Sequence, residues 1–222
     1  MENQQTYQMR QAQAGVLATN KVLRNTYVLL ALTLAFSAIV AGVAAATKAP
    51  ALPWFVTLIG YFGLLFVTTK LRNSAGGLVA VFALTGFMGY TLGPLLSLYA
   101  SIPGGNQIVM LAFGGTAAIF FVMSGIALVT RKDFSFMGKF LLVGILVAFV
   151  AGIGAIFFNL PGLSLAVAAM FMVLSSLMIL YQTSEIIHGG ETNYIMATVT
   201  LYVSLYNIFV SLLQLLGVMG DD

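Results

Sequence analysis

Seven long apolar runs dominate this sequence and limit what it can fold into. Each run approaches the roughly 20 residues that a helix needs to cross the hydrocarbon core of a bilayer. In lipid every backbone donor and acceptor needs a partner within the protein, which leaves helices or a closed β-barrel. A barrel would show alternating segments of roughly 10 residues, whereas these runs are continuous. The pattern predicts an all-α, seven-helix membrane protein with spans at about 27–46, 53–69, 78–99, 108–129, 137–158, 163–181 and 194–218.

The composition indicates that lipid surrounds most of the chain. Hydrophobic residues make up 60% of the 222 residues and charged residues only 7%, whereas a soluble domain has about 25% charged residues. The formal net charge of +3 comes from basic residues spread over several loops. Such a distribution does not form a basic face, so we expect no nucleic-acid partner. The chain has no cysteine, which excludes disulfides and cysteine-ligated metals.

The chain is expected to form one membrane domain, residues 27–218, between two polar ends. Residues 1–26 are rich in Gln and predict a flexible cytoplasmic tail, and residues 219–222 predict a short external C-terminus. The positive-inside rule places basic residues in the cytoplasm. With the N-terminus inside, eight of the nine basic residues are cytoplasmic and only Lys48 is external; the eight are Arg10, Lys21, Arg24, Lys70, Arg72, Arg131, Lys132 and Lys139.

A stripe of uncharged polar residues follows the last span. Its members are spaced 4, 3, 4 and 3 residues apart, which places them on one helix face: Thr200, Ser204, Asn207, Ser211 and Gln214. A polar stripe facing hydrocarbon would be costly, so we predict that it is buried and that the last helix is central. Two interpretations stay open: hydrogen bonds to neighbouring helices, or a polar conduit or ligand site. Under the first, Asn207→Leu should be tolerated poorly, because its partners would lose a hydrogen bond.

The third span contains small residues at a helical spacing. Gly89 and Gly93 form a small-xxx-small pair, which permits close approach of another helix. Pro94 should kink this span, since proline lacks a backbone donor and clashes with the preceding turn. Helix packing is the predicted role of this segment.

Candidate catalytic groups are scarce. Glu185, His188 and Glu191 cluster near the cytoplasmic end of the sixth span, where they could bind a metal, sense pH or simply supply loop polarity. The sequence has no paired intramembrane carboxylates, and its single His lies at a loop. A buried serine nucleophile would therefore lack a base. We predict no enzyme activity, no cofactor and no metal site.

Three stretches resemble the Bax inhibitor-1-like family: Lys21–Tyr27, Thr130–Phe136 and the run IIHGGETNYIMATVTLYVSLYNIFVSLL from Ile186 to Leu213. The resemblance covers almost the whole chain, with the first 20 residues least alike. It implies seven helices with the last one central. It also implies a protein of the bacterial inner membrane that binds the ATP-dependent protease FtsH, with its regulators HflK and HflC. Such a protein restrains degradation of membrane substrates and is itself a slow substrate, gripped by its cytosolic tail.

The chain departs from the family at one pair of positions. Calcium-leak members carry one aspartate near the cytoplasmic end of the sixth helix and one in the seventh, and the matching residues here are Gln182 and Ser204. Without that pair, a divalent cation lacks the charged oxygen ligands it prefers. The alternatives are therefore a protease-modulating interaction protein and an ion channel or transporter for calcium or protons. The missing carboxylates favour the first, and we predict weak or no calcium conduction.

Overall fold

The fold consists of seven helices, as the apolar runs predict. The computed structural model describes the backbone of residues 2–219 and the side chains of residues 19–218. Within that part the chain is all-helical, and each helix is long and apolar enough to cross a membrane. The helices are α1 (Glu2–Ala46), α2 (Trp54–Leu71), α3 (Ala75–Ala100), α4 (Gly105–Thr130), α5 (Met137–Phe157), α6 (Pro161–His188) and α7 (Tyr194–Met219).

Turn residues set several of the helix ends. Pro53 precedes α2 and Pro161 opens α6, positions where the missing N–H removes no helical hydrogen bond. Gly189 ends α6 with φ 77°, a left-handed conformation that glycine adopts without strain. Helix α3 does not end at Pro94 but continues through it to Ala100.

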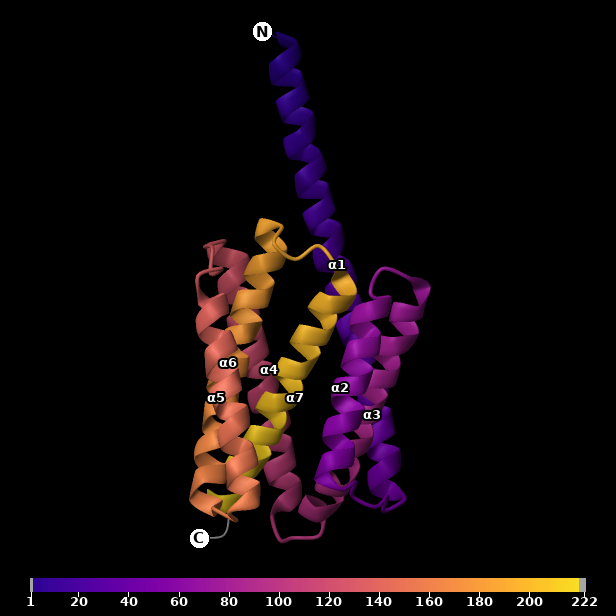
Figure 1. Cartoon of the computed structure of the whole chain (residues 1–222), viewed down its shortest axis with the longest axis vertical. Helices are drawn as coiled ribbons and strands as arrows, with labels where there is room; N and C mark the ends of the chain where they lie inside the picture. The colour runs from indigo at the N-terminus through magenta and orange to yellow at the C-terminus, as the bar shows by residue number, and fades with distance from the viewer. Residues whose placement is uncertain (1, 220–222) are drawn as a thin grey trace.

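Helix α1 begins much earlier than the sequence predicts. A flexible tail was expected over residues 1–26, yet the backbone is helical from Glu2, and the membrane-spanning part begins at Thr19. The early residues are mostly Gln, Ala, Glu, Met and Arg, all good helix formers. Figure 1 shows this part of α1 projecting beyond the ends of the other helices. At the other end, Asp221 and Asp222 lie outside the described residues.

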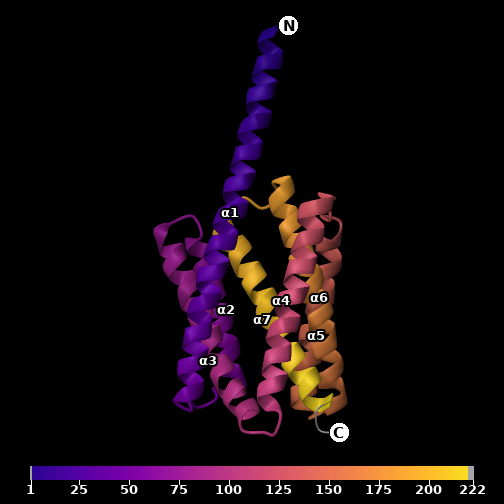
Figure 2. The ribbon, with the colours of Figure 1, turned by 180° about the vertical axis from the view of Figure 1, so that it is seen from behind.

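Helix α7 occupies the centre of the bundle. Helices α1 and α2 each pack on α3, while α4 and α5 each pack on α6. Helix α7 crosses diagonally between these two groups (Figures 1 and 2) and contacts α1, α3, α4 and α6. The sequence-based prediction of a central last helix agrees with this arrangement.

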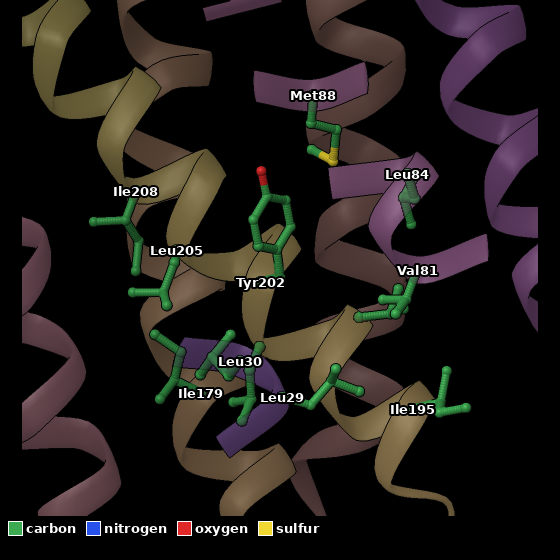
Figure 3. Close-up of a cluster of buried hydrophobic side chains, with 12 residues drawn as sticks. Leu29, Leu30, Val81, Leu84, Met88, Ile179, Ile195, Tyr202, Leu205 and Ile208 are labelled. Carbon is green, nitrogen blue, oxygen red and sulfur yellow. The ribbon is translucent and has the colours of Figure 1, made fainter. Parts of the chain in front are cut away.

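A buried tyrosine joins α7 to α1 and α3. Tyr202 is 2% exposed, and its hydroxyl donates to the Thr85 carbonyl at 3.1 Å and accepts from the Ser37 hydroxyl. Figure 3 shows the apolar side chains that surround it, which come from α1, α3, α6 and α7: Leu29, Leu30, Val81, Leu84, Met88, Ile179, Ile195, Leu205 and Ile208. The core thus binds the two helix groups together through α7.

Glycines allow α3 to lie directly against α1. A Cβ added at Gly89 would lie 2.5 Å from the Ser37 carbonyl oxygen, and one at Gly93 would overlap Ala44. Neither position leaves room for a side chain. The predicted packing role of Gly89 and Gly93 is therefore confirmed.

Candidate functional site

The polar stripe of α7 makes few bonds to other helices. Thr200 Oγ1 donates to the Met196 carbonyl at 3.1 Å and Ser204 Oγ to the Thr200 carbonyl at 2.8 Å, both within α7. Gln214 does reach a neighbour, because its Nε2 donates to Ser164 Oγ on α6 at 2.8 Å. The stripe is therefore not a ladder of interhelical hydrogen bonds.

Burial differs along the stripe. Ser204 and Ser211 are buried, whereas Thr200, Asn207 and Gln214 are half-buried. Asn207, for which the sequence left open either a bond to a neighbouring helix or a place on a conduit, lines a hollow and forms no side-chain hydrogen bond within the described part of the chain. An amide without a partner at this depth indicates that the stripe borders open space.

That space is a crevice between α2 and α3 on one side and α5 and α6 on the other, with α7 as its floor. Its larger part has a volume of about 640 Å³. A second hollow of about 390 Å³ shares Thr57, Leu58 and Phe149 with it and extends to Gln214. We call the two hollows together the α2–α5 crevice. Its lining includes Thr57 and Phe62 of α2, Leu146 of α5, Ser175 of α6, and Ser204 and Asn207 of α7.

Aromatic side chains bridge the two walls of the crevice. The rings of Trp54 and Phe157 have centroids 5.6 Å apart, and those of Phe62 and Phe149 have centroids 5.8 Å apart, both close to edge-to-face. Helix α2 otherwise packs closely only on α3. Phe62 and Leu146 line the crevice and are also 47% and 54% exposed. The crevice therefore opens on the lipid-facing surface between α2 and α5.

Among the lining residues that sequence reasoning missed is a buried serine. Ser175 on α6 is 3% exposed, lines the crevice and has no hydrogen-bond partner among the described residues. Its neighbour Ser176 instead donates to the Met172 carbonyl at 2.6 Å. The available signal was the Ser175-Ser176 pair within an apolar span, but a pair does not reveal which hydroxyl is free.

The positions that match the family's aspartate pair do not both line the crevice. Ser204 lines the crevice, whereas Gln182 is 5% exposed and is not part of the lining. The Gln182 Nε2 has no hydrogen-bond partner, and no hydrogen bond joins Gln182 to Ser204 among the described residues. No charged side chain lines the described crevice either. The arrangement thus offers hydroxyl and amide groups in apolar surroundings.

At the C-terminal end of α6, His188 joins the helix to the loop between α4 and α5. His188 Nδ1 lies 2.9 Å from the Ser184 carbonyl oxygen, and its Nε2 lies 3.1 Å from the Arg131 carbonyl oxygen. Glu191 accepts a hydrogen bond from the Asn193 N–H at 2.7 Å. Across the described residues, no three His, Asp or Glu side chains gather in a way that could hold a metal ion. His188 therefore fastens the α4–α5 loop to α6.

Asp133 lies exposed in that same loop. Hydrogen bonds from the backbone and side chain of Ser135, with a smaller contribution from nearby His188, lower the pKa of the Asp133 carboxyl. The carboxylate therefore stays ionised at neutral pH and orders the turn.

Comparison with known proteins assigns the family. Residues 19–221 match the family model described as "Inhibitor of apoptosis-promoting Bax1". The chain belongs to the Bax inhibitor-1-like family. The match begins where α1 enters the membrane and includes all seven spans. The resemblance inferred from the sequence is thereby confirmed.

Relatives within the Bax inhibitor-1-like family match nearly the whole chain. An uncharacterized protein of Pseudomonas aeruginosa is 55% identical over 99% of both chains. The Escherichia coli K12 protein named Modulator of FtsH protease YccA is 53% identical over 94% of both chains. A protein of another Escherichia coli strain, equally similar, is named Inner membrane protein YccA. With its seven spans, this member of the family is a multi-pass inner-membrane protein.

The structure changes what we expect of Asn207 in this family member. Because Asn207 forms no side-chain hydrogen bond to any described residue, Asn207→Leu should shift the free energy of unfolding by no more than about 0.5 kcal/mol. Gln214→Leu removes the bond to Ser164 and should cost about 0.6 kcal/mol, the average for such bonds. Thermal unfolding of both variants in detergent tests this. A larger loss for Asn207→Leu than for Gln214→Leu would show that Asn207 has a partner after all.

Proposed function

We propose that this protein binds the membrane protease FtsH and restrains its degradation of membrane proteins. The observation that carries the proposal is the 53% identity, over 94% of both chains, with the relative named Modulator of FtsH protease YccA. A match over nearly the full length supports transfer of a property of the whole membrane domain. We include the FtsH regulators HflK and HflC as partners in the same assembly.

The chemistry of the crevice supports binding better than catalysis. Covalent catalysis needs a nucleophile beside a base. The described crevice has hydroxyl groups but no charged side chain, and the single His, His188, contacts backbone carbonyl oxygens elsewhere. We therefore propose a non-enzymatic role in which surfaces of the membrane domain engage the protease.

The N-terminal part of α1 supplies the segment that FtsH would grip. Its backbone projects beyond the bundle (Figure 1), and 17 helical residues at about 1.5 Å each span roughly 25 Å. Unfolded, about 20 residues would reach roughly 70 Å. A short helix that projects into water is marginally stable, so an ATP-driven protease can unwind it. Extraction of seven packed helices from lipid would then be slow, which makes the protein a slow substrate.

Orientation forms part of the proposal. Seven of the described basic residues lie at one end of the bundle, and Lys48 lies at the other; the seven are Lys21, Arg24, Lys70, Arg72, Arg131, Lys132 and Lys139. The positive-inside rule then places the N-terminus in the cytoplasm and the C-terminus in the periplasm. Reporter fusions after Arg72 and Arg131 should be cytoplasmic, and those after Gly105 and Asp222 periplasmic. A cytoplasmic C-terminal reporter would contradict this topology.

Co-isolation with FtsH tests the proposed partner. FtsH with an inactivated protease site, expressed at its normal level, should bring down the full-length protein from detergent-solubilised membranes. An unrelated multi-pass protein expressed to the same level serves as the control. Recovery no greater than that of the control would overturn the proposal.

A second candidate function rests on the crevice itself. Polar groups along α7 within a membrane could form an ion pathway, as in the calcium-leak members of the family. The Gln182 and Ser204 positions lack carboxylates, so reconstituted protein should give little calcium flux into dye-loaded liposomes. The double variant Gln182→Asp with Ser204→Asp should raise that flux. Strong flux from the unchanged protein would favour the transporter function instead.

A further inference from the structure

We propose that the α2–α5 crevice docks a transmembrane helix of a partner protein, one that presents an uncharged polar side chain near the middle of the bilayer. The inference rests on the proposed function, because it gives that function a contact surface inside the membrane. Polar groups without partners, the opening of the crevice towards lipid and a lining without charged side chains in the described part of the chain support it.

Two polar groups in the crevice lack partners at the same depth. Ser175 lies about midway along α6 (Pro161–His188), and Asn207 lies about midway along α7 (Tyr194–Met219). Both line the crevice, and neither side chain forms a hydrogen bond within the described part of the chain. Ser175 is 3% exposed, so its hydroxyl is deeply set and meets open space only through the crevice. A hydrogen bond between helices in the membrane is stabilising, so an occupant that bonds to these groups would be favoured over one that cannot.

The crevice is accessible from the lipid. Phe62 on α2 and Leu146 on α5 are exposed at its mouth. Helix α2 packs closely only on α3 and meets α5 through aromatic side chains. A helix that diffuses in the bilayer can therefore reach the mouth without passing through water, and rotation of a few aromatic rings would widen it.

The chemistry of the crevice selects among occupants. A lipid acyl chain carries no hydrogen-bonding group at mid-depth, so it would leave Ser175 and Asn207 unpaired. An ion would find no opposite charge, because no charged side chain lines the described crevice. A transmembrane helix with Ser, Thr, Asn or Gln at its centre supplies both an apolar surface and the missing hydrogen bonds. Of these three occupants, only the helix both packs against the apolar walls and forms hydrogen bonds with the polar groups.

The test uses a transmembrane peptide as the probe. Full-length protein is reconstituted in phosphatidylcholine vesicles with a dansyl-labelled 20-residue polyleucine peptide that has either Asn or Leu at its centre. The single tryptophan, Trp54, lies in the crevice lining and serves as the energy-transfer donor. We expect the Asn peptide to associate about five- to thirtyfold more tightly, the effect of one intramembrane hydrogen bond in model peptides.

Three variants show whether the crevice accounts for this preference. Ser175→Ala and Asn207→Leu should each reduce the preference for the Asn peptide to less than twofold. Ser176→Ala is the matched control, since the Ser176 hydroxyl already bonds to the Met172 carbonyl, and it should keep the full preference. If Asn207→Leu fails to fold, the comparison of Ser175→Ala with Ser176→Ala decides alone.

Several results would overturn the inference. Equal affinity for the two peptides, or a preference that survives both crevice variants, would exclude docking at this site. Labelling of a single cysteine at Asn207→Cys by a membrane-impermeant thiol reagent would show a water-filled conduit instead. The assay contains no FtsH, so its failure leaves the proposed function to be judged by co-isolation. Failure of co-isolation alone would leave the crevice as a helix-docking site for another membrane protein.

Discussion

Removal of residues 2–15 is expected to protect the protein from FtsH while the membrane helices remain folded. The deleted segment lies before Thr19, where the membrane-spanning part of α1 begins, and before residue 19, where the family match begins. The seven spans and the buried contacts of Tyr202 are therefore unaffected. Without a projecting end, the protease has nothing to unwind, whereas the membrane domain can still occupy it.

The measurement is a chase of protein half-life in cells with and without active FtsH. Full-length protein should decay slowly and only when FtsH is active, and the truncated protein should be stable in both strains. Turnover of other FtsH membrane substrates should stay as slow as with the full-length protein, or become slower. Equal decay of the two forms would show that the tail is not the segment FtsH grips. A stable truncated protein with normal turnover of other substrates would show that inhibition requires the tail.

Gly93→Leu should prevent stable folding of the membrane domain. The position has no room for a side chain, since an added Cβ would overlap Ala44 and lie 3.0 Å from its backbone carbon. Helices α1 and α3 would have to separate, which would disturb their neighbouring packing around Tyr202. Overpacking by smaller groups costs about 1–3 kcal/mol, and a leucine against backbone should cost more. We expect little or no monodisperse protein from solubilised membranes.

Alanine substitutions at Gly89 and at two exposed glycines show how the change in stability depends on the space around each glycine. A methyl at Gly89 would lie 2.5 Å from the Ser37 carbonyl oxygen, so this variant should be destabilised by about 1–3 kcal/mol. Gly63 and Gly114 have nothing within 4 Å of an added Cβ, and alanine there should stabilise the helix by about 0.5–1 kcal/mol. Thermal unfolding that ranks Gly89→Ala equal to Gly63→Ala would contradict the close packing of α1 on α3.

The seven spans and the glycine contact were predictable because they depend on local pattern. Hydropathy over about 20 residues defines a span regardless of its neighbours, and the spacing of Gly89 and Gly93 defines a flat helix face. The polar stripe of α7 was predictable in the same way. Its spacing shows that Thr200, Ser204 and Asn207 share a face, but spacing cannot show whether a helix or an opening covers that face.

The crevice could not be predicted because it depends on the packing of distant segments. Ser175 becomes part of the site only because the packing of α6 and α7 places both Ser175 and Asn207 on the lining of one crevice. The sequence likewise gives no reason to prefer Ser175 over Ser176. The N-terminal segment shows a second limit of sequence-based prediction. Its polarity suggested a flexible tail, but polarity alone does not distinguish a loose chain from a projecting helix, and the helix-forming residues favour the latter.

Degradation by purified FtsH tests the central claim most directly. FtsH is reconstituted with ATP and a labelled membrane substrate, and the full-length protein is added in increasing amounts. We predict that the initial rate of substrate degradation falls as the protein is added, while the protein itself disappears much more slowly than the substrate. The form lacking residues 2–15 should inhibit at least as well and should not disappear. An unchanged rate of substrate degradation at a large excess of either form would contradict the claim that this protein restrains FtsH.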